Sequence, residues 1–274
     1  MRSGNKNKKK EDREAREEMN RITKKFEELK AQGRKGLIGY LTAGDPNPEA
    51  SEKNIRIAIE NGLDILELGV PFSDPTADGP VIQEASQRAL AAGMNVSKVL
   101  QIVKNLRRDV DLPVVLFGYT NPFFRYGYEK ICADAAKAGV DGILVVDLPH
   151  EHSAELRPFM DKHGLFLITL IAPTTLKERV SFILKNAQGF VYYIMVTGVT
   201  GARDKMAEDI TSHVNELRKC TNLPIAAGFG VSNGAQAKQA AKSADAVVVG
   251  SALVKAAKEG KLAQLTAELS KALH

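Results

Sequence analysis

The sequence of 274 residues contains little cysteine and no long apolar run. Its two cysteines, Cys132 and Cys220, are too few and too far apart for a disulfide framework or a zinc site, and we expect reduced thiols. No apolar segment approaches the roughly 18 residues that a membrane-spanning helix needs, so no membrane partner is expected. Residues 1–20 have no apolar core and many glutamates, unlike a secretory signal or a transit peptide. The expected location is the cytoplasm.

Positive charge is concentrated at one end of the chain. Residues 1–35 hold 13 Lys or Arg and 7 Asp or Glu, whereas the remainder holds 25 and 26. We expect residues 1–18 to form a basic, flexible N-terminal extension and residues 19–274 to form a single catalytic domain. A nucleic-acid role for the extension is the alternative. It is not favoured, because no aromatic residues interleave with the lysines as base stacking would require.

The rest of the sequence repeats one theme, a short run of Val, Ile and Leu followed by a loop and a helical stretch. The runs are continuous, as in parallel strands that are covered on both faces. Strands are expected at 36–42, 64–69, 113–119, 142–147, 165–171, 189–196, 224–230 and 245–251. Eight such units predict an α/β fold, the (β/α)8 TIM barrel, in preference to a doubly wound open sheet.

Helical patterns add detail to this prediction. A helix at 19–33 precedes the first strand and is expected to cover the bottom of the barrel. The spacing between the second and third strands is the longest, which predicts an insertion after strand two. Asn47 and Ser97 are expected N-caps, and Gly62 is an expected C-terminal stop.

The second strand and the loop after it carry carboxylates where a barrel places its chemistry, at the C-terminal ends of strands. Glu67 lies near the end of "DILELG". If it points into the barrel, desolvation should raise its pKa and suit it to proton transfer. Asp78 follows in "PFSDPTADGP", a loop stiffened by prolines. Asp74 is a competing acid in that loop, and spacing alone favours neither aspartate.

Glycine-rich loops follow the last two strands. Gly228 and Gly230 lie in "AAGFGVSNG", and Gly250 and Ser251 lie in "VVVGSALVKA". Backbone N–H groups at such loops bind the phosphate of phosphorylated substrates in many barrels. The first loop departs from the spacing of a dinucleotide fingerprint, and phosphate is favoured over NAD. Residues 196–209 are long enough for a lid over the site.

Several reaction classes are disfavoured by what the strand ends lack. A Schiff-base aldolase needs a desolvated lysine there, and none of the predicted strand ends carries one. The "HEH" run at 150–152 has no third ligand in view, so no metal is expected. Acid–base chemistry by carboxylates remains, on a substrate that supplies its own electron sink.

Four motifs resemble the tryptophan synthase α subunit family: "ELGVPFSDPTADGP" (67–80), "LTAGDP" (41–46), "GVTGAR" (198–203) and "GFG" (228–230). The resemblance extends from about Lys24 to the C-terminus. It implies a carbon–carbon lyase of tryptophan biosynthesis that cleaves indole-3-glycerol phosphate to indole and glyceraldehyde 3-phosphate by retro-aldol chemistry. It also implies an α2β2 heterotetramer. There, indole passes through a tunnel to a β subunit that holds pyridoxal phosphate, and no cofactor is expected in this chain.

The resemblance also implies roles for individual residues. Glu67 would be the general acid and base at the indole C3 and the glycerol hydroxyl, and Asp78 would hold the indole N–H. Thr200 would close over Asp78, and the loop from Asp74 to Gly79 would face the partner. The substrate pocket would be lined by Tyr40, Tyr119 and Tyr192, and the phosphate would be held by Gly201, Gly230, Gly250 and Ser251. Met195 and Phe190 depart from the residues expected at their positions.

Two other functions fit parts of the sequence. A sugar-phosphate isomerase or epimerase would explain the glycine loops, but not the Pro-rich loop with its carboxylates. A barrel kept only to bind or activate its partner would not need Glu67 and Asp78.

Overall fold

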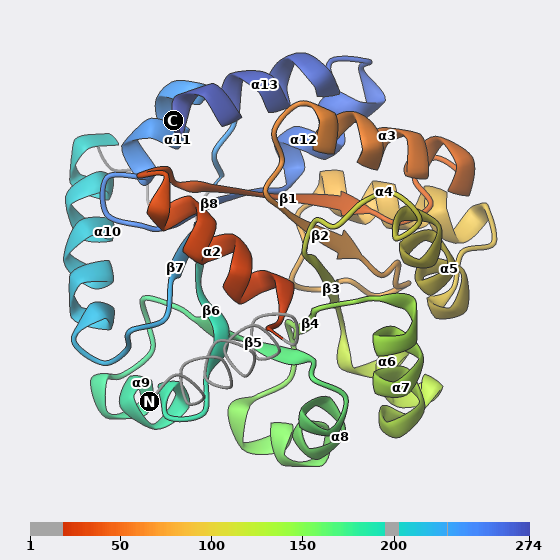
Figure 1. Ribbon diagram of the computed structural model, residues 1–274, viewed down its shortest axis with the longest axis horizontal. Coiled ribbons are helices and arrows are strands. Elements are labelled where there is room, and N and C mark those ends of the chain that lie inside the picture. The colour runs from red at the N-terminus through yellow and green to blue at the C-terminus, as the bar shows by residue number, and fades with distance from the viewer. Residues whose placement is uncertain (1–18, 195–202, 229) are drawn as a thin grey trace, which may run out of the picture.

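The computed structural model describes residues 19–194, 203–228 and 230–274. Eight parallel strands form a closed barrel in which each strand pairs with its neighbours in chain order, and β8 returns to β1 (Figure 1). The predicted (β/α)8 barrel is confirmed. The expected extension at residues 1–18 lies outside the described residues. None of the helices within the described ranges is long and apolar enough to cross a membrane.

The strands lie where the apolar runs predicted them, but most are shorter. They are β1 Gly36–Thr42, β2 Ile65–Gly69, β3 Val114–Gly118, β4 Gly142–Val145, β5 Phe166–Ile171, β6 Gln188–Ile194, β7 Ile225–Gly228 and β8 Ala246–Val249. The predictions 142–147, 224–230 and 245–251 extended too far. Asp147 leaves β4 to accept hydrogen bonds from Thr120, and Ser251 already begins the next helix. Residues 195 and 196 of the sixth predicted strand are not described.

Helices surround the barrel (Figure 1). In chain order they are α2 Arg21–Ala31, α3 Pro48–Glu60, α4 Pro80–Ala91, α5 Val96–Leu106, α6 Thr120–Tyr126, α7 Tyr128–Ala138, η1 His150–Glu155, α8 Arg157–Lys162, α9 Lys177–Leu184, α10 Arg203–Arg218, α11 Gly234–Ala240, α12 Ser251–Lys258 and α13 Leu262–Ala272. Two helices, α4 and α5, lie between β2 and β3. They account for the predicted insertion after strand two.

Helix α2 lies across one end of the barrel, as predicted (Figure 1). Its buried Ile22, Phe26 and Leu29 pack into the cluster of interior strand residues. The helix is shorter than the predicted 19–33 because the side chain of Asn20 caps it, accepting a hydrogen bond of 3.0 Å from the Ile22 backbone N–H. Burial of one apolar stripe therefore closes the bottom of the barrel.

Helix ends follow side-chain capping. Asn47 caps α3 as predicted, accepting from the Ala50 N–H at 2.9 Å, and Gly62 follows that helix with φ of +99°. The prediction of Ser97 as a cap is wrong. Asn95 caps α5 instead, because its extended backbone lets the side chain accept from the Lys98 N–H at 3.1 Å. Ser97 lies within the first turn.

Alternation along the strands decides which residues face the barrel interior. Ile38 and Ile65 belong to the interior cluster, together with buried residues of the other strands. Two positions further along β1 and β2, Tyr40 and Glu67 face the same way and are register partners. The apolar interior thus ends in a polar layer at the C-terminal ends of the strands.

Candidate active site

Glu67 is buried in an apolar environment at the end of β2. Its exposure is 0%, and neither carboxyl oxygen has a hydrogen-bond partner within the described part of the chain. Desolvation raises the pKa of Glu67 to about 8, because burial disfavours the charged form. The expected rise is confirmed. At neutral pH the side chain is therefore a carboxylic acid with a proton to give.

Asp78 lies in the loop between β2 and α4. Desolvation raises the pKa of Asp78 to about 6, while a hydrogen bond with Tyr119 acts in the opposite direction. The Tyr119 hydroxyl also accepts from the Ala77 N–H at 3.0 Å, and the Asp78 carbonyl accepts from Gln83 at 2.9 Å. These bonds fix the loop so that Asp78 lies beside a strand-end tyrosine.

Asp74, the competing acid of the same loop, lies elsewhere. It is exposed; its side chain accepts from the Ser73 hydroxyl, and its backbone carbonyl accepts from the Thr76 N–H at 2.9 Å. Asp74 therefore shapes the turn before Pro75. Of the two aspartates, Asp78 is the one that contacts Tyr119.

Three buried tyrosines lie around the two acids. Tyr40, Tyr119 and Tyr192 are 5%, 2% and 7% exposed. Burial raises the pKa of each phenol, and the negative charge of Asp78 contributes to the rise in all three. Glu67 contributes at Tyr40 and Tyr192. Because charge effects weaken with distance, these shared influences indicate one cluster at the top of the barrel.

Two glycines make room for the phenols. A Cβ atom at Gly69 would lie 2.2 Å from the hydroxyl oxygen of Tyr40, and one at Gly228 would lie 2.8 Å from that of Tyr192. Both distances are shorter than contacts between real side chains. Gly228, which also begins the predicted phosphate loop, ends β7 and accommodates Tyr192.

The loops after β7 and β8 present backbone groups on the same side of the barrel. Gly230 has φ of +60°, a conformation that favours glycine. Gly250 is the N-cap of α12, and the exposed Ser251 is its first residue. A helix start of this kind offers unpaired N–H groups to an anion. Thr200, Gly201 and Met195 lie outside the described residues.

Other residues of this region were missed by sequence reasoning. The Thr42 hydroxyl lies 3.4 Å from that of Tyr40, and the Phe117 ring packs edge-on against Tyr40 with centroids 5.1 Å apart. Phe72 packs against Tyr119 at 5.3 Å. Strand alternation is the signal that would have found Thr42, since it lies two residues after Tyr40.

The remaining predictions concern residues away from this cluster. His150 and Glu151 of the "HEH" run begin η1; the ring of His150 packs edge-on against Phe182, and Glu151 pairs with Arg179. Within the described ranges no three His, Cys, Asp or Glu residues gather in a way that would hold a metal ion. Phe190 packs against Phe26 of α2, at the opposite end of the barrel from Glu67. The presence of phenylalanine at position 190 therefore affects packing at the bottom of the barrel.

Comparison with known proteins gives a consistent result. Residues 26–273 match the family model described as tryptophan synthase alpha chain. A relative of that name from Geobacter sulfurreducens is 48% identical over 252 residues, covering 92% of this chain and 96% of its own length.

Solved structures agree. A crystal structure of tryptophan synthase alpha chain from Legionella pneumophila superposes with a TM-score of 0.85 at 37% identity, covering 93% of this chain and 97% of its own. A crystal structure of tryptophan synthase from M. tuberculosis, in an aminoacrylate-bound form, has a TM-score of 0.85 at 34% identity and covers 93% and 100%.

Proposed function

The chain belongs to the tryptophan synthase alpha chain family, and we propose that Glu67 and Asp78 are the catalytic residues of its reaction. It is an α subunit that acts in tryptophan biosynthesis, a lyase that cleaves indole-3-glycerol phosphate. The observation that carries the assignment is the complete burial of the Glu67 carboxyl group, without a hydrogen-bond partner in the described part of the chain, in the same tyrosine-lined region as Asp78.

Glu67 supplies the proton that starts the reaction. An indole carbanion is a poor leaving group, so C3 must be protonated before the carbon–carbon bond can break. Protonation turns the ring into an electron acceptor. The glycerol hydroxyl next to that bond then loses its proton to the Glu67 carboxylate, the bond electrons return to the ring, and an aldehyde forms. The proton that Glu67 gives is replaced by the one it takes, and each acid–base role is worth about 10²–10⁴ in rate.

Asp78 offsets the positive charge that grows on the indole nitrogen. Its carboxylate would accept the indole N–H, an interaction that strengthens as the ring becomes cationic and so favours the transition state. Its pKa of about 6 leaves it mostly ionised at neutral pH, in contrast to Glu67. Two carboxyl groups with pKa values on opposite sides of 7 suit an acid and an electrostatic partner.

The rest of the substrate is held by the tyrosines and the glycine loops. Tyr40, Tyr119 and Tyr192 would enclose the indole ring. The phosphate would bind the N-terminus of α12 at Gly250 and Ser251 together with Gly228 and Gly230. We also assign Gly201 to the phosphate and Thr200 to closure over Asp78, on the "GVTGAR" motif alone.

The family name implies a β partner, and we propose an α2β2 assembly. The loop from Asp74 to Gly79 would face that partner, and indole would pass directly to it. Pyridoxal phosphate would be held by the β subunit. The retro-aldol steps above need only proton transfers, so this chain requires no cofactor of its own.

Carboxylate replacements test the assignment. Glu67→Gln removes the proton donor while keeping the shape of the side chain, and we expect indole release from indole-3-glycerol phosphate to fall about 10²–10⁴-fold or more. Asp78→Asn should also lose most activity. Asp74→Asn is the matched control from the same loop and should keep the turnover of the isolated chain. Indole release is measured at equal concentrations of folded protein, checked by circular dichroism and β-subunit binding. Wild-type turnover in Glu67→Gln would refute the assignment.

A further inference from the structure

Although the barrel is closed, β4 and β5 are paired over only part of their length, which leaves an opening in the wall at their C-terminal ends. These strands pair at only two positions, Gly142 with Phe166 and Ile143 with Leu167. By contrast, β3 and β4 pair at four positions. In addition, β5 shifts register against β6 after Ile168. The C-terminal halves of β4 and β5 therefore lack the hydrogen bonds that close the rest of the barrel.

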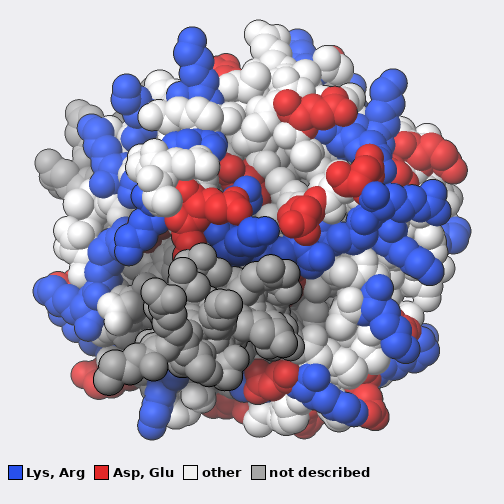
Figure 2. Space-filling model, in the orientation of Figure 1, with Lys and Arg blue, Asp and Glu red and all other residues white. Residues whose placement is uncertain are grey.

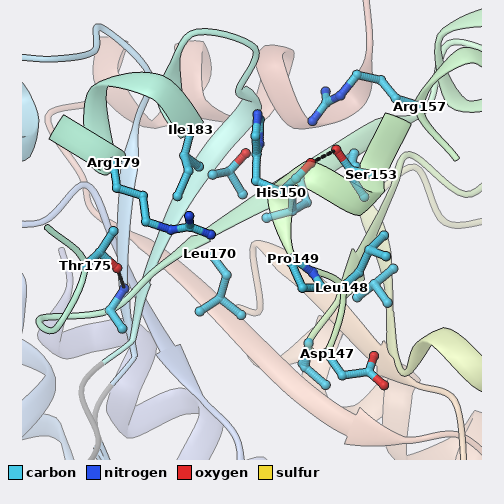
Figure 3. Close-up of a pocket in the computed structure, with 16 residues that line it drawn as sticks. Asp147, Leu148, Pro149, His150, Ser153, Arg157, Leu170, Thr175, Arg179 and Ile183 are labelled. Carbon is cyan, nitrogen blue, oxygen red and sulfur yellow. Dashed lines mark hydrogen bonds between the residues drawn. The ribbon is translucent and has the colours of Figure 1, made fainter. Parts of the chain in front are cut away.

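A cavity of about 360 Å³ lies at this opening (Figure 3). Val146 and Leu170 line it from the interior side, and Leu167 and Ile183 line it from the side of the covering helices. Its size lies within the range of about 300–1,000 Å³ that is usual for small-molecule sites. The lining comes from β4 and β5 and from the loops and the helices η1, α8 and α9 that follow them.

The helix side of the cavity carries positive charge. Arg157 donates to the Asn186 carbonyl at 2.9 Å, and none of the described carboxylates lies within 4.0 Å of its guanidinium. Arg179 is already paired with Glu151, at 2.6 and 3.0 Å. His150 is not a competing cation, because burial and the nearby arginines lower its pKa. Arg157 is thus the cation left for a ligand.

The one carboxylate among the described lining residues, Asp147, lies away from Arg157 in Figure 3. Its Oδ1 accepts from the backbone N–H and the hydroxyl of Thr120, at 2.7 and 2.9 Å. Because these bonds tie Asp147 to α6, it does not neutralise Arg157. The cavity therefore combines apolar walls with one unmatched positive charge at one side.

We propose that this cavity binds a small carboxylate with an apolar, ring-sized body. The body would lie between Leu170 and Ile183, and the carboxylate would pair with Arg157, whose planar guanidinium matches two carboxylate oxygens. Leu170 is the register partner of Tyr192, so the site adjoins the catalytic layer without sharing its acids. The inference depends on the cavity and its charges, and it is independent of the proposed function.

A titration with 2-naphthoate tests the proposal on the full chain with methyl-labelled Ile, Leu and Val. We expect saturable NMR shifts centred on Leu167, Leu170 and Ile183. The neutral isostere 2-naphthamide should bind at least about 10-fold more weakly, as loss of a charge-assisted hydrogen bond predicts. Arg157→Gln should weaken 2-naphthoate by a similar factor and bring the two probes to equal affinity. Arg108→Gln, an exposed charge at the end of α5, is the matched control and should change nothing.

Other results would overturn the proposal. One is equal affinity of the unaltered protein for 2-naphthoate and 2-naphthamide, and another is an unchanged affinity for 2-naphthoate in Arg157→Gln. A third is an absence of saturable shifts. The fourth is displacement of 2-naphthoate by glycerol 3-phosphate, with shifts at Val248 and Val249 in place of those at the cavity. The last result would place the probe in the substrate pocket. The comparison of acid and amide needs no variant, so it decides the question even if Arg157→Gln folds poorly.

Discussion

At the scale of single residues, the site depends on a carboxyl group that is buried without hydrogen bonds. Such a group is costly when charged, because nothing replaces the water it loses. The chain retains Glu67 in its neutral form over the physiological range, with a pKa of about 8. Asp78 keeps a partner in Tyr119 and a lower pKa of about 6. The difference between the two environments separates the proton donor, Glu67, from the ionised electrostatic partner, Asp78.

This burial predicts how stability depends on pH. Between pH 6 and 8 the folded protein holds a proton on Glu67 that the unfolded chain, with a pKa near 4.5, has released. Stabilisation by this proton is fully present below pH 4.5 and is lost as pH rises towards 8. The free energy of unfolding should therefore fall by up to about 1.4 kcal/mol per pH unit from this group. Urea unfolding measures it, and Glu67→Gln should lack the decline. Parallel pH curves for both proteins would contradict the burial.

The sequence could predict Glu67 but could not choose between the aspartates. A glutamate in an otherwise apolar strand is an anomaly that has a functional explanation. Asp74 and Asp78 have similar neighbours in the sequence. They differ because Tyr119, which directly follows β3, forms a hydrogen bond with the side chain of Asp78 and not with that of Asp74. That contact depends on how the strands are arranged in space.

At the scale of elements, local chemistry fixes where helices begin and where strands end. Continuous apolar runs were enough to predict all eight strands, because parallel strands are buried on both faces. Their ends were less predictable. Asp147 and Ser251 each continue an apolar run in the sequence. The strands stop before them, because Asp147 accepts a hydrogen bond from Thr120 and Ser251 begins α12. The opening between β4 and β5 was not predictable either, because register is not visible in single strands.

The N-cap of α5 gives a test at this scale. Asn95→Ala removes the side-chain acceptor of the Lys98 N–H, and we expect a loss of about 1 kcal/mol in the free energy of unfolding. Ser97→Ala, two residues later on the exposed first turn, should cost less than about 0.5 kcal/mol. Chemical denaturation of both variants checks this. A larger loss of unfolding free energy for Ser97→Ala than for Asn95→Ala would show that Ser97 is the N-cap of α5, as the sequence predicted.

At the scale of the whole molecule, the two ends of the barrel have different roles, one in the chemistry and the other in stability. The end with Glu67 holds unpaired polar groups, whereas the other end is closed by α2 and by ion pairs. Asp141, 3% exposed, accepts from Arg21 at 3.0 Å, Arg107 at 2.9 Å and the Val114 N–H at 2.8 Å. The carboxylate of Asp141 thus joins α2, α5 and β3. Figure 2 shows Lys and Arg side chains spread over the face that α2 covers, with acidic side chains among them.

Disrupting that junction should reduce stability without changing the chemistry. Burial raises the pKa of Asp141 despite its arginines, so desolvation outweighs pairing, and the network serves to hold elements together. Asp141→Ala leaves Arg107 partly buried and without this partner, and we expect a loss of roughly 3–5 kcal/mol in unfolding free energy. The kcat of the folded fraction should stay within a few-fold of wild type. A fall in kcat comparable to that of Glu67→Gln would contradict the division between the two ends.

The pH dependence of kcat/KM for cleavage of indole-3-glycerol phosphate tests the central claim most directly, because it reports ionisations of the free enzyme. If a protonated Glu67 starts the reaction, kcat/KM must fall as pH rises through about 8, where that proton is lost. We predict this alkaline limb in the wild-type protein and in Asp74→Asn. A rate that stays level from pH 7 to 9, or that rises as a carboxyl group with a pKa near 4.5 ionises, would show that Glu67 is not the buried acid described above.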